Sequence, residues 1–140
     1  EKGYLHWGHD ISPEENQYEA GLNFTISYKK NVNFIGKDIL LKKKGKQLKK
    51  KLIILSLKKS EPGFPLMLHD EPIYSDGKII GRTTSGNYSF NYKKNIAFGY
   101  VNPAHDLKKT KIEIEVEKRK YEAIVEDKPI HDPDNKILKS

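Results

Sequence analysis

The segment at residues 1–10, EKGYLHWGHD, holds the side chains best suited to bind a ligand. Tyr4 and Trp7 offer flat faces for stacking, and the indole of Trp7 also has an N–H group to place. Gly3 and Gly8 permit backbone turns that other residues resist. Two interpretations follow: the aromatic pair fills an edge of the core, or it lines a ligand site.

The same segment has two histidines, and they raise the question of a metal site. His6 and His9 are three residues apart, as ligands on one helical face would be. No third ligand lies at a telling distance in the sequence, so we expect no metal ion here. The chain has no cysteine, which excludes a disulfide framework and any cysteine-based metal or redox centre.

Nothing in the chain has the pattern of a catalytic site. Ser85 lacks the G-x-S-x-G context of a nucleophile elbow. The Gly81-to-Gly86 spacing does not match a phosphate-binding or dinucleotide-binding fingerprint. Asp10 and Glu19 are separate acids with no reason to share a proton. We therefore expect no catalytic residue in these 140 residues.

The net charge of +7, from 26 basic and 19 acidic residues, admits a nucleic-acid partner. Only Arg82 and Arg119 are arginines, however, and lysine lacks the bidentate fork that reads guanine. A lysine-rich composition that enlarges the surface charge is the simpler interpretation, so we expect no nucleic-acid partner.

The sequence shows no pattern typical of a membrane span or a signal peptide. No apolar run approaches the roughly 18 residues of a membrane span, and residues 1–10 lack the apolar region of a signal peptide. We expect a cytoplasmic location and no membrane partner. The chain starts without Met in the middle of a pattern, and we interpret it as a fragment of a longer protein.

The stretch Glu71–Val101 predicts the centre of a β-barrel or sandwich. Asp76-Gly77 suits a two-residue type I′ hairpin turn, which needs positive φ at both positions. Thr83–Gly86 is typical of a small polar loop, and Ile96–Val101 of a buried strand. A further strand is expected at Lys51–Leu57.

A second hairpin follows the first. The sequence KIEIEVE at Lys111–Glu117 alternates strictly, which predicts a strand with its aliphatic residues inward. A turn near Lys118-Arg119 should return the chain through Lys120–Val125. His131–Asn135 predicts a final turn.

The N-terminal third predicts mixed structure. Ser12 and Glu15 form a capping-box pattern, so a short helix should start there and end near residues 20–21. Alternation over Asn23–Tyr28 predicts a strand, and Phe34–Leu41 predicts a second helix. The lysine run at Lys42–Lys51 is the expected domain boundary.

Several motifs together resemble the glycine-cleavage T-protein (aminomethyltransferase) family. The order E-P-I-Y, D-G, T-S-G and A-F-G-Y-V in the central stretch resembles the C-terminal barrel of that family. Further strings that match in order are Glu1–Tyr4, Trp7–Ile11, Glu19–Leu22 and Phe34–Lys37. At the position of Trp7 the family usually has tyrosine. A tryptophan there resembles the flavin-dependent sarcosine and dimethylglycine dehydrogenases.

The resemblance implies a mainly β fold: an antiparallel barrel of about six strands over residues 49–140, preceded by a short α/β arm. The arm, residues 1–48, would be the C-terminal piece of a folate-binding domain. The expected cofactors are tetrahydrofolate, and FAD in an absent N-terminal part. By the same resemblance, Trp7, Tyr4 and Glu19 are the candidate cofactor-binding residues.

The implied function is a share in tetrahydrofolate binding within a dehydrogenase that oxidises an N-methyl amine. The expected partners are upstream folate-binding and flavin domains of the same chain and the small amine substrate. Two alternatives stand beside it: a fragment of an aminomethyltransferase, and a basic β-barrel that binds nucleic acid. The family's catalytic aspartate would lie before Glu1, so the isolated chain should be inactive.

Overall fold

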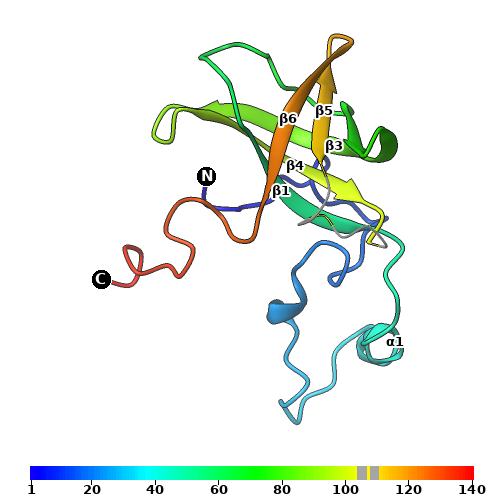
Figure 1. The fold of residues 1–140 in the computed structure, drawn as a ribbon. Coiled ribbons are helices and arrows are strands. Elements are labelled where there is room, and N and C mark those ends of the chain that lie inside the picture. Colours follow the sequence, from blue (N-terminus) through cyan, green and yellow to red (C-terminus); the bar gives the residue numbers. More distant parts are fainter. Residues whose placement is uncertain (104–106, 108–110) are drawn as a thin grey trace.

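The fold is a closed antiparallel barrel of six strands, seen in a computed structural model that describes residues 1–103, 107 and 111–140. Around the barrel the strands follow the order β1-β4-β3-β2-β5-β6, and Figure 1 shows β5 and β6 crossing the face of β3 and β4. This confirms the predicted fold class. The strands are β1 (Lys51–Leu57), β2 (Pro72–Ser75), β3 (Lys78–Ser89), β4 (Lys94–Val101), β5 (Ile112–Val116) and β6 (Arg119–Glu126).

The barrel interior is filled by aliphatic side chains that alternate along the strands. In β5, every second residue is buried, as the strict alternation predicted. Leu55, Ile73 and Ile114 have no exposed surface and lie at the centre of the cluster. Burying such a side chain contributes about 1.5–3 kcal/mol each, so the barrel carries most of the chain's hydrophobic stabilisation.

Both predicted hairpins are present. Asp76 and Gly77 have φ of 47° and 79°, and Ser75 pairs with Lys78 on either side of them. These positive angles are the ones a type I′ turn requires. The second turn occupies residues 117–118, one residue earlier than expected, because Val116 pairs with Arg119.

The polar loop predicted at Thr83–Gly86 is wrong. These residues belong to β3, which runs for 12 residues and pairs with β4 along this stretch. The register shifts between Thr83 and Ser85, and this leaves Thr84 as the extra residue of a bulge. A bulge keeps the strand paired while it bends the strand, so short polar residues do not interrupt it.

In the N-terminal arm, residues 1–48, two predictions are wrong. The helix expected from Ser12 to residues 20–21 does not form. The capping box is present, since the Ser12 N–H donates to Glu15 Oε2 at 2.8 Å, but the residues that follow it make only turns. Instead of a strand at residues 23–28, a 3₁₀ helix, η1, spans Asn23–Thr25. The closed barrel offers no free sheet edge, so the alternating residues have no strand to pair with.

The second predicted helix forms in part. Helix α1 spans Lys37–Lys43 and begins three residues later than expected, because Gly36 at its N-cap is left-handed. No residue of α1 is buried, and Figure 1 shows the part of the arm around α1 extending away from the barrel. In the described part of the chain, no helix has the length and apolar character to cross a membrane. The domain boundary at residues 48–49 stays a prediction.

Candidate ligand-binding groove

A tight turn presents the aromatic residue that the sequence singled out. The Gly8 N–H donates to the Ile11 carbonyl at 2.8 Å, and Trp7 and Ile11 form an isolated parallel bridge. Gly8 has φ of 92°, which only glycine adopts without strain. The buried Asp10 closes the turn, since its Oδ2 accepts the His6 N–H at 2.8 Å.

Asp10 also fastens this turn to the barrel. Its Oδ1 accepts hydrogen bonds from Thr84 Oγ1 at 2.6 Å and Ser85 Oγ at 2.7 Å, both at the β3 bulge. The Asp10 carbonyl accepts the Tyr100 hydroxyl of β4 at 3.0 Å. Burial, followed by the carboxylates of Glu15, Asp10 and Glu19, raises the pKa of Tyr100 and keeps its hydroxyl protonated. The sequence did not identify this anchor, because its members lie more than 70 residues apart.

The turn forms one wall of an open groove of about 1040 Å³. Tyr4 and Trp7 line it from the N-terminal segment, and residues 51–54 of β1 line it from the barrel. Tyr4 is 70% exposed and Trp7 is 67% exposed. Two large aromatic side chains therefore present most of their surface to the groove and solvent, instead of filling the core of this chain.

Glu19 is placed differently from the two aromatic residues. It is buried, its Oε2 accepts the Asn16 N–H at 3.2 Å, and its carbonyl accepts the Leu52 N–H at 2.8 Å. It does not line the groove. The structure thus brings Tyr4 and Trp7 together and leaves Glu19 at the joint between arm and barrel.

A second open groove, of about 840 Å³, holds His9 and His69. The His6 and His9 ring centroids are 4.7 Å apart, and those of His9 and His69 are 5.9 Å apart. The hydrogen bond from His69, with Arg82 nearby, lowers the pKa of Asp70. No group of three or more metal-binding side chains within residues 1–103, 107 and 111–140 is arranged to hold a metal ion.

The sequence family is established by the barrel. Residues 50–132 match the model of the glycine cleavage T-protein C-terminal barrel domain, and the chain belongs to this family. The match does not favour the nucleic-acid-binding alternative.

Similar curated proteins include an oxidase, a dehydrogenase and an aminomethyltransferase. The chain is 37% identical over 139 residues to 4-methylaminobutanoate oxidase (formaldehyde-forming) of Paenarthrobacter nicotinovorans, covering 99% of this chain and 16% of that protein. It is 34% identical to mitochondrial sarcosine dehydrogenase of Mus musculus, again over 99% of this chain and 16% of that protein. It is also 34% identical to an aminomethyltransferase of Symbiobacterium thermophilum, over 89% of this chain and 32% of that protein.

A solved structure supports the fold. The glycine cleavage system aminomethyltransferase T of Bartonella henselae superposes with a TM-score of 0.80 at 21% identity, covering 94% of this chain and 36% of that one. The chain therefore spans about a sixth of the first two curated relatives and about a third of the aminomethyltransferases.

Proposed function

We propose that this chain is the C-terminal part of a flavin-linked, folate-dependent dehydrogenase of the sarcosine and dimethylglycine type. Within it, the aromatic groove helps to bind tetrahydrofolate, the acceptor of the methyl-derived carbon. The 37% and 34% identities to an oxidase and a dehydrogenase over nearly the whole chain support this choice. The flavin and amine sites would lie in upstream domains of the same polypeptide, for which we propose a cytoplasmic location.

The observation that carries the proposal is the exposure of Trp7 and Tyr4 on one groove wall. Large aromatic side chains at the surface of a pocket are typical of ligand sites. Asp10 holds the backbone of the Trp7 turn against the barrel, so this backbone does not have to be ordered when a ligand arrives. A preorganised contact loses less entropy on binding.

The groove residues fit tetrahydrofolate chemically. The flat pterin and aminobenzoyl rings suit stacking on Trp7 and Tyr4. Lys51 lies on the same lining and offers a cation to the glutamate carboxylates of the ligand, whereas Lys2 and Lys128 there are paired with Asp132 and Asp134. When bound, tetrahydrofolate accepts a one-carbon unit as its methylene derivative. The part of this chain is to bind and orient that ligand, with Glu19 acting through the arm joint.

The arm also suits a chain with preceding domains. Phe24, Val32, Ile35 and Ile39 are mostly or fully exposed, and they lie on the arm that leaves the barrel. A soluble protein rarely leaves such a surface uncovered. An upstream folate-binding domain that packs on these side chains would bury them, as the proposed division at residues 48–49 requires.

The 140-residue chain alone should be inactive. We propose that the activated nucleophile, the flavin site and the amine site all belong to upstream residues, so we expect no demethylation of sarcosine or dimethylglycine by the purified chain. Measurable turnover by this chain would refute the assignment of catalysis to upstream residues.

The proposal is tested by titrating tetrahydrofolate into the full-length protein and its Trp7→Ala variant. Loss of a stacking aromatic should weaken binding about tenfold, because stacking contributes roughly 1–3 kcal/mol. Flavin reduction by the amine should be nearly unchanged. If Trp7 only packs, the variant instead has a lower melting temperature and keeps its folate affinity.

An aminomethyltransferase remains the second candidate, supported by the 34% identity to the Symbiobacterium thermophilum enzyme. The two candidates differ in the polypeptide before Glu1. A dinucleotide-binding fingerprint in a long N-terminal part identifies the dehydrogenase, whereas a shorter chain without one identifies the transferase.

A further inference from the structure

The C-terminal turn, residues 128–137, forms the wall of the aromatic groove that faces the N-terminal segment. Asp132 organises this turn: its side chain is only 4% exposed, and it accepts the N–H groups of Lys136 at 2.7 Å and Ile137 at 3.2 Å. Burial alone raises the pKa of Asp132, but the Ile137 and Lys136 N–H groups and the Lys2 ammonium outweigh it and lower the pKa. The Asp132 carboxylate is therefore buried and charged, and it binds three partners: the two backbone N–H groups and the Lys2 ammonium.

The same carboxylate reaches the other end of the chain. Lys2 Nζ lies 3.3 Å from Asp132 Oδ2, and both residues line the groove. Next to this ion pair, the His131 N–H donates to the Glu1 carbonyl at 3.1 Å. Gly3 packs so tightly that an added Cβ would lie 2.4 Å from Pro129 Cγ. The two terminal segments thus touch at three successive points.

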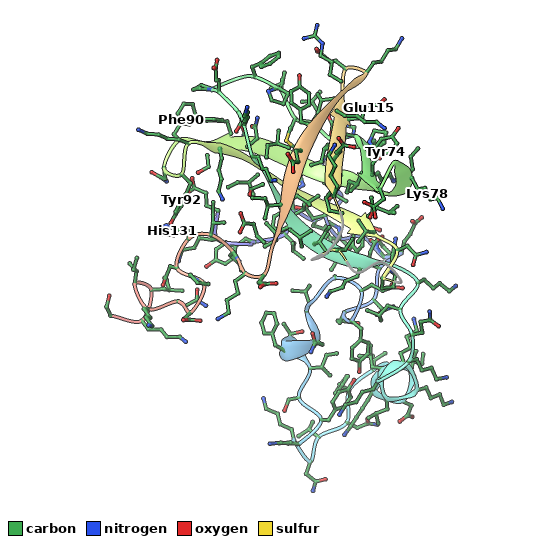
Figure 2. All side chains as sticks on the ribbon, viewed as in Figure 1. Tyr74, Lys78, Phe90, Tyr92, Glu115 and His131 are labelled. Atoms are coloured by element: carbon green, nitrogen blue, oxygen red, sulfur yellow. The ribbon has the colours of Figure 1, made fainter. Side chains whose placement is uncertain are left out.

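The β3–β4 hairpin supports this junction from the barrel side. His131 Nδ1 and the Tyr92 hydroxyl are 3.1 Å apart, and Figure 2 shows the two side chains together beside the barrel. Glu1 accepts hydrogen bonds from Ser89 and, at 2.9 Å, from Asn91. These bonds lower the pKa of Glu1. The hairpin therefore fixes the ends of both segments. Among the ion pairs of the described residues, only Lys2–Asp132 joins one groove wall to the other.

We propose that Asp132, acting through Lys2, is a positioning residue for the aromatic groove. Lys2 lies two residues before Tyr4, and Asp132 fixes the opposite wall, so their ion pair, beside the Gly3–Pro129 contact, holds the two walls at their separation. A ligand stacked on Tyr4 and Trp7 is then held against residues 128–135. The identity of that ligand as a folate rests on the proposed function.

Three single variants of the full-length protein separate positioning from simple folding of the turn. Asp132→Asn weakens both the turn and the ion pair. Lys2→Met removes the ion pair and leaves the two backbone N–H bonds to Asp132 in place. Asp134→Asn is the matched control: it neutralises a carboxylate of the same turn, one that is exposed and pairs with Lys128 at 3.1 Å.

Two readouts are measured on each variant. Hydrogen exchange should rise in the peptide containing His131 for both Lys2→Met and Asp132→Asn, but in the peptide containing residues 136–137 only for Asp132→Asn. Affinity for tetrahydrofolate should fall about fivefold or more in both, within the usual range for coupled sites. Asp134→Asn should match the wild type in both readouts.

The proposal is overturned if Lys2→Met leaves the His131 peptide as protected as in Asp134→Asn, or if Lys2→Met binds tetrahydrofolate as tightly as the wild type. A wild type that binds no tetrahydrofolate overturns the proposed function instead. In that case the exchange pattern alone decides whether the ion pair joins the two walls.

Discussion

The barrel and the N-terminal arm achieve order in different ways. The barrel has a continuous aliphatic core of buried residues drawn from all six strands and the loop before β2. The arm, residues 1–48, buries a single hydrophobic residue, Ala20, and leaves Ile35 fully exposed. The contrast indicates that the barrel is stable through its own packing, whereas the arm has only a few polar contacts within this chain and would be covered by the upstream domain proposed above.

The polar contacts of the arm are specific. Within the arm, the Tyr18 and Tyr28 hydroxyls are hydrogen-bonded, and Tyr18 also donates to the Leu40 carbonyl at 3.1 Å. Desolvation, with a smaller contribution from Tyr18, raises the pKa of Tyr28 to about 12. Between arm and barrel, an ion pair joins Glu15 to Lys50, directly before β1. A hydrogen bond contributes only about 1 kcal/mol, so this order is more easily lost than that of the barrel.

The largest expected loss of stability comes from a substitution in the barrel core. Leu55→Ala should lower the free energy of unfolding by about 2–5 kcal/mol, because it leaves a cavity in a fully buried site. Ile35→Ala, at an exposed site of the arm, should change it by less than about 0.5 kcal/mol. Urea unfolding followed by circular dichroism gives both values. Equal losses would contradict the division into a packed barrel and an unpacked arm.

A smaller effect is expected at the joint between the two regions. In the wild type, the two carboxylate oxygens of Asp10 accept three hydrogen bonds. Asp10→Asn replaces one of these oxygens with an NH2 group, which cannot accept, so we expect the free energy of unfolding to fall by about 1–3 kcal/mol. Limited proteolysis should then cut within residues 1–48 faster while the barrel stays intact. Asp38→Asn, in the first turn of α1, is the control and should leave the cleavage rate unchanged.

The contrast also explains what the sequence could predict. The barrel strands carry period-two alternation, and the two hairpins have residues suited to their turns, so local patterns and long-range packing agree. The bulge at Thr84 was missed because a polar triplet has the same composition in a loop and in a bulged strand. The pairing partner on β4 decides between the two, and it is distant in sequence.

The arm was predicted less well for a related reason. The capping box of Ser12 forms, yet the Glu15 carboxylate also pairs with Lys50, and the chain leaves the helical path after a turn. Within the candidate site, aromatic type and flanking glycines singled out Trp7 and Tyr4. The roles of Asp10 and Asp132 depend on contacts across more than 70 residues, which no local pattern reports.

Acid should lower the stability of both the barrel and the arm, because each has a carboxylate whose pKa is lowered in the folded state. Burial raises the pKa of Glu126, but Lys94 and Ser56 outweigh it, and the pKa is lowered; the same holds for Glu15 beside Lys50. Stability from these groups is therefore complete above the unfolded-state pKa of about 4.3 and is lost as pH falls through the lower folded-state values.

Urea unfolding at pH 7 and at pH 3 measures this loss. Glu126→Gln should reduce the difference between the two conditions for the barrel, because the neutral amide does not titrate and cannot form the ion pair that Glu126 makes with Lys94 at 2.8 Å. An unchanged difference in the variant would contradict the assignment to Glu126.

The smallest effect on stability is expected at the groove itself. Trp7→Ala in the 140-residue chain should change the free energy of unfolding by less than about 0.5 kcal/mol, because the side chain is mostly exposed. Thermal unfolding of wild type and variant tests this. A fall of several degrees in the melting temperature would favour a packing role for Trp7 in the barrel edge.

The proposed site for tetrahydrofolate is the groove between the N-terminal turn and the C-terminal turn. Hydrogen exchange of the full-length protein, measured with and without tetrahydrofolate, locates the bound ligand. We expect slower exchange on binding in peptides covering residues 2–11 and 127–135, and no change at the β5–β6 turn. Protection that appears instead around His69 and Arg82, or nowhere in this chain, would contradict it.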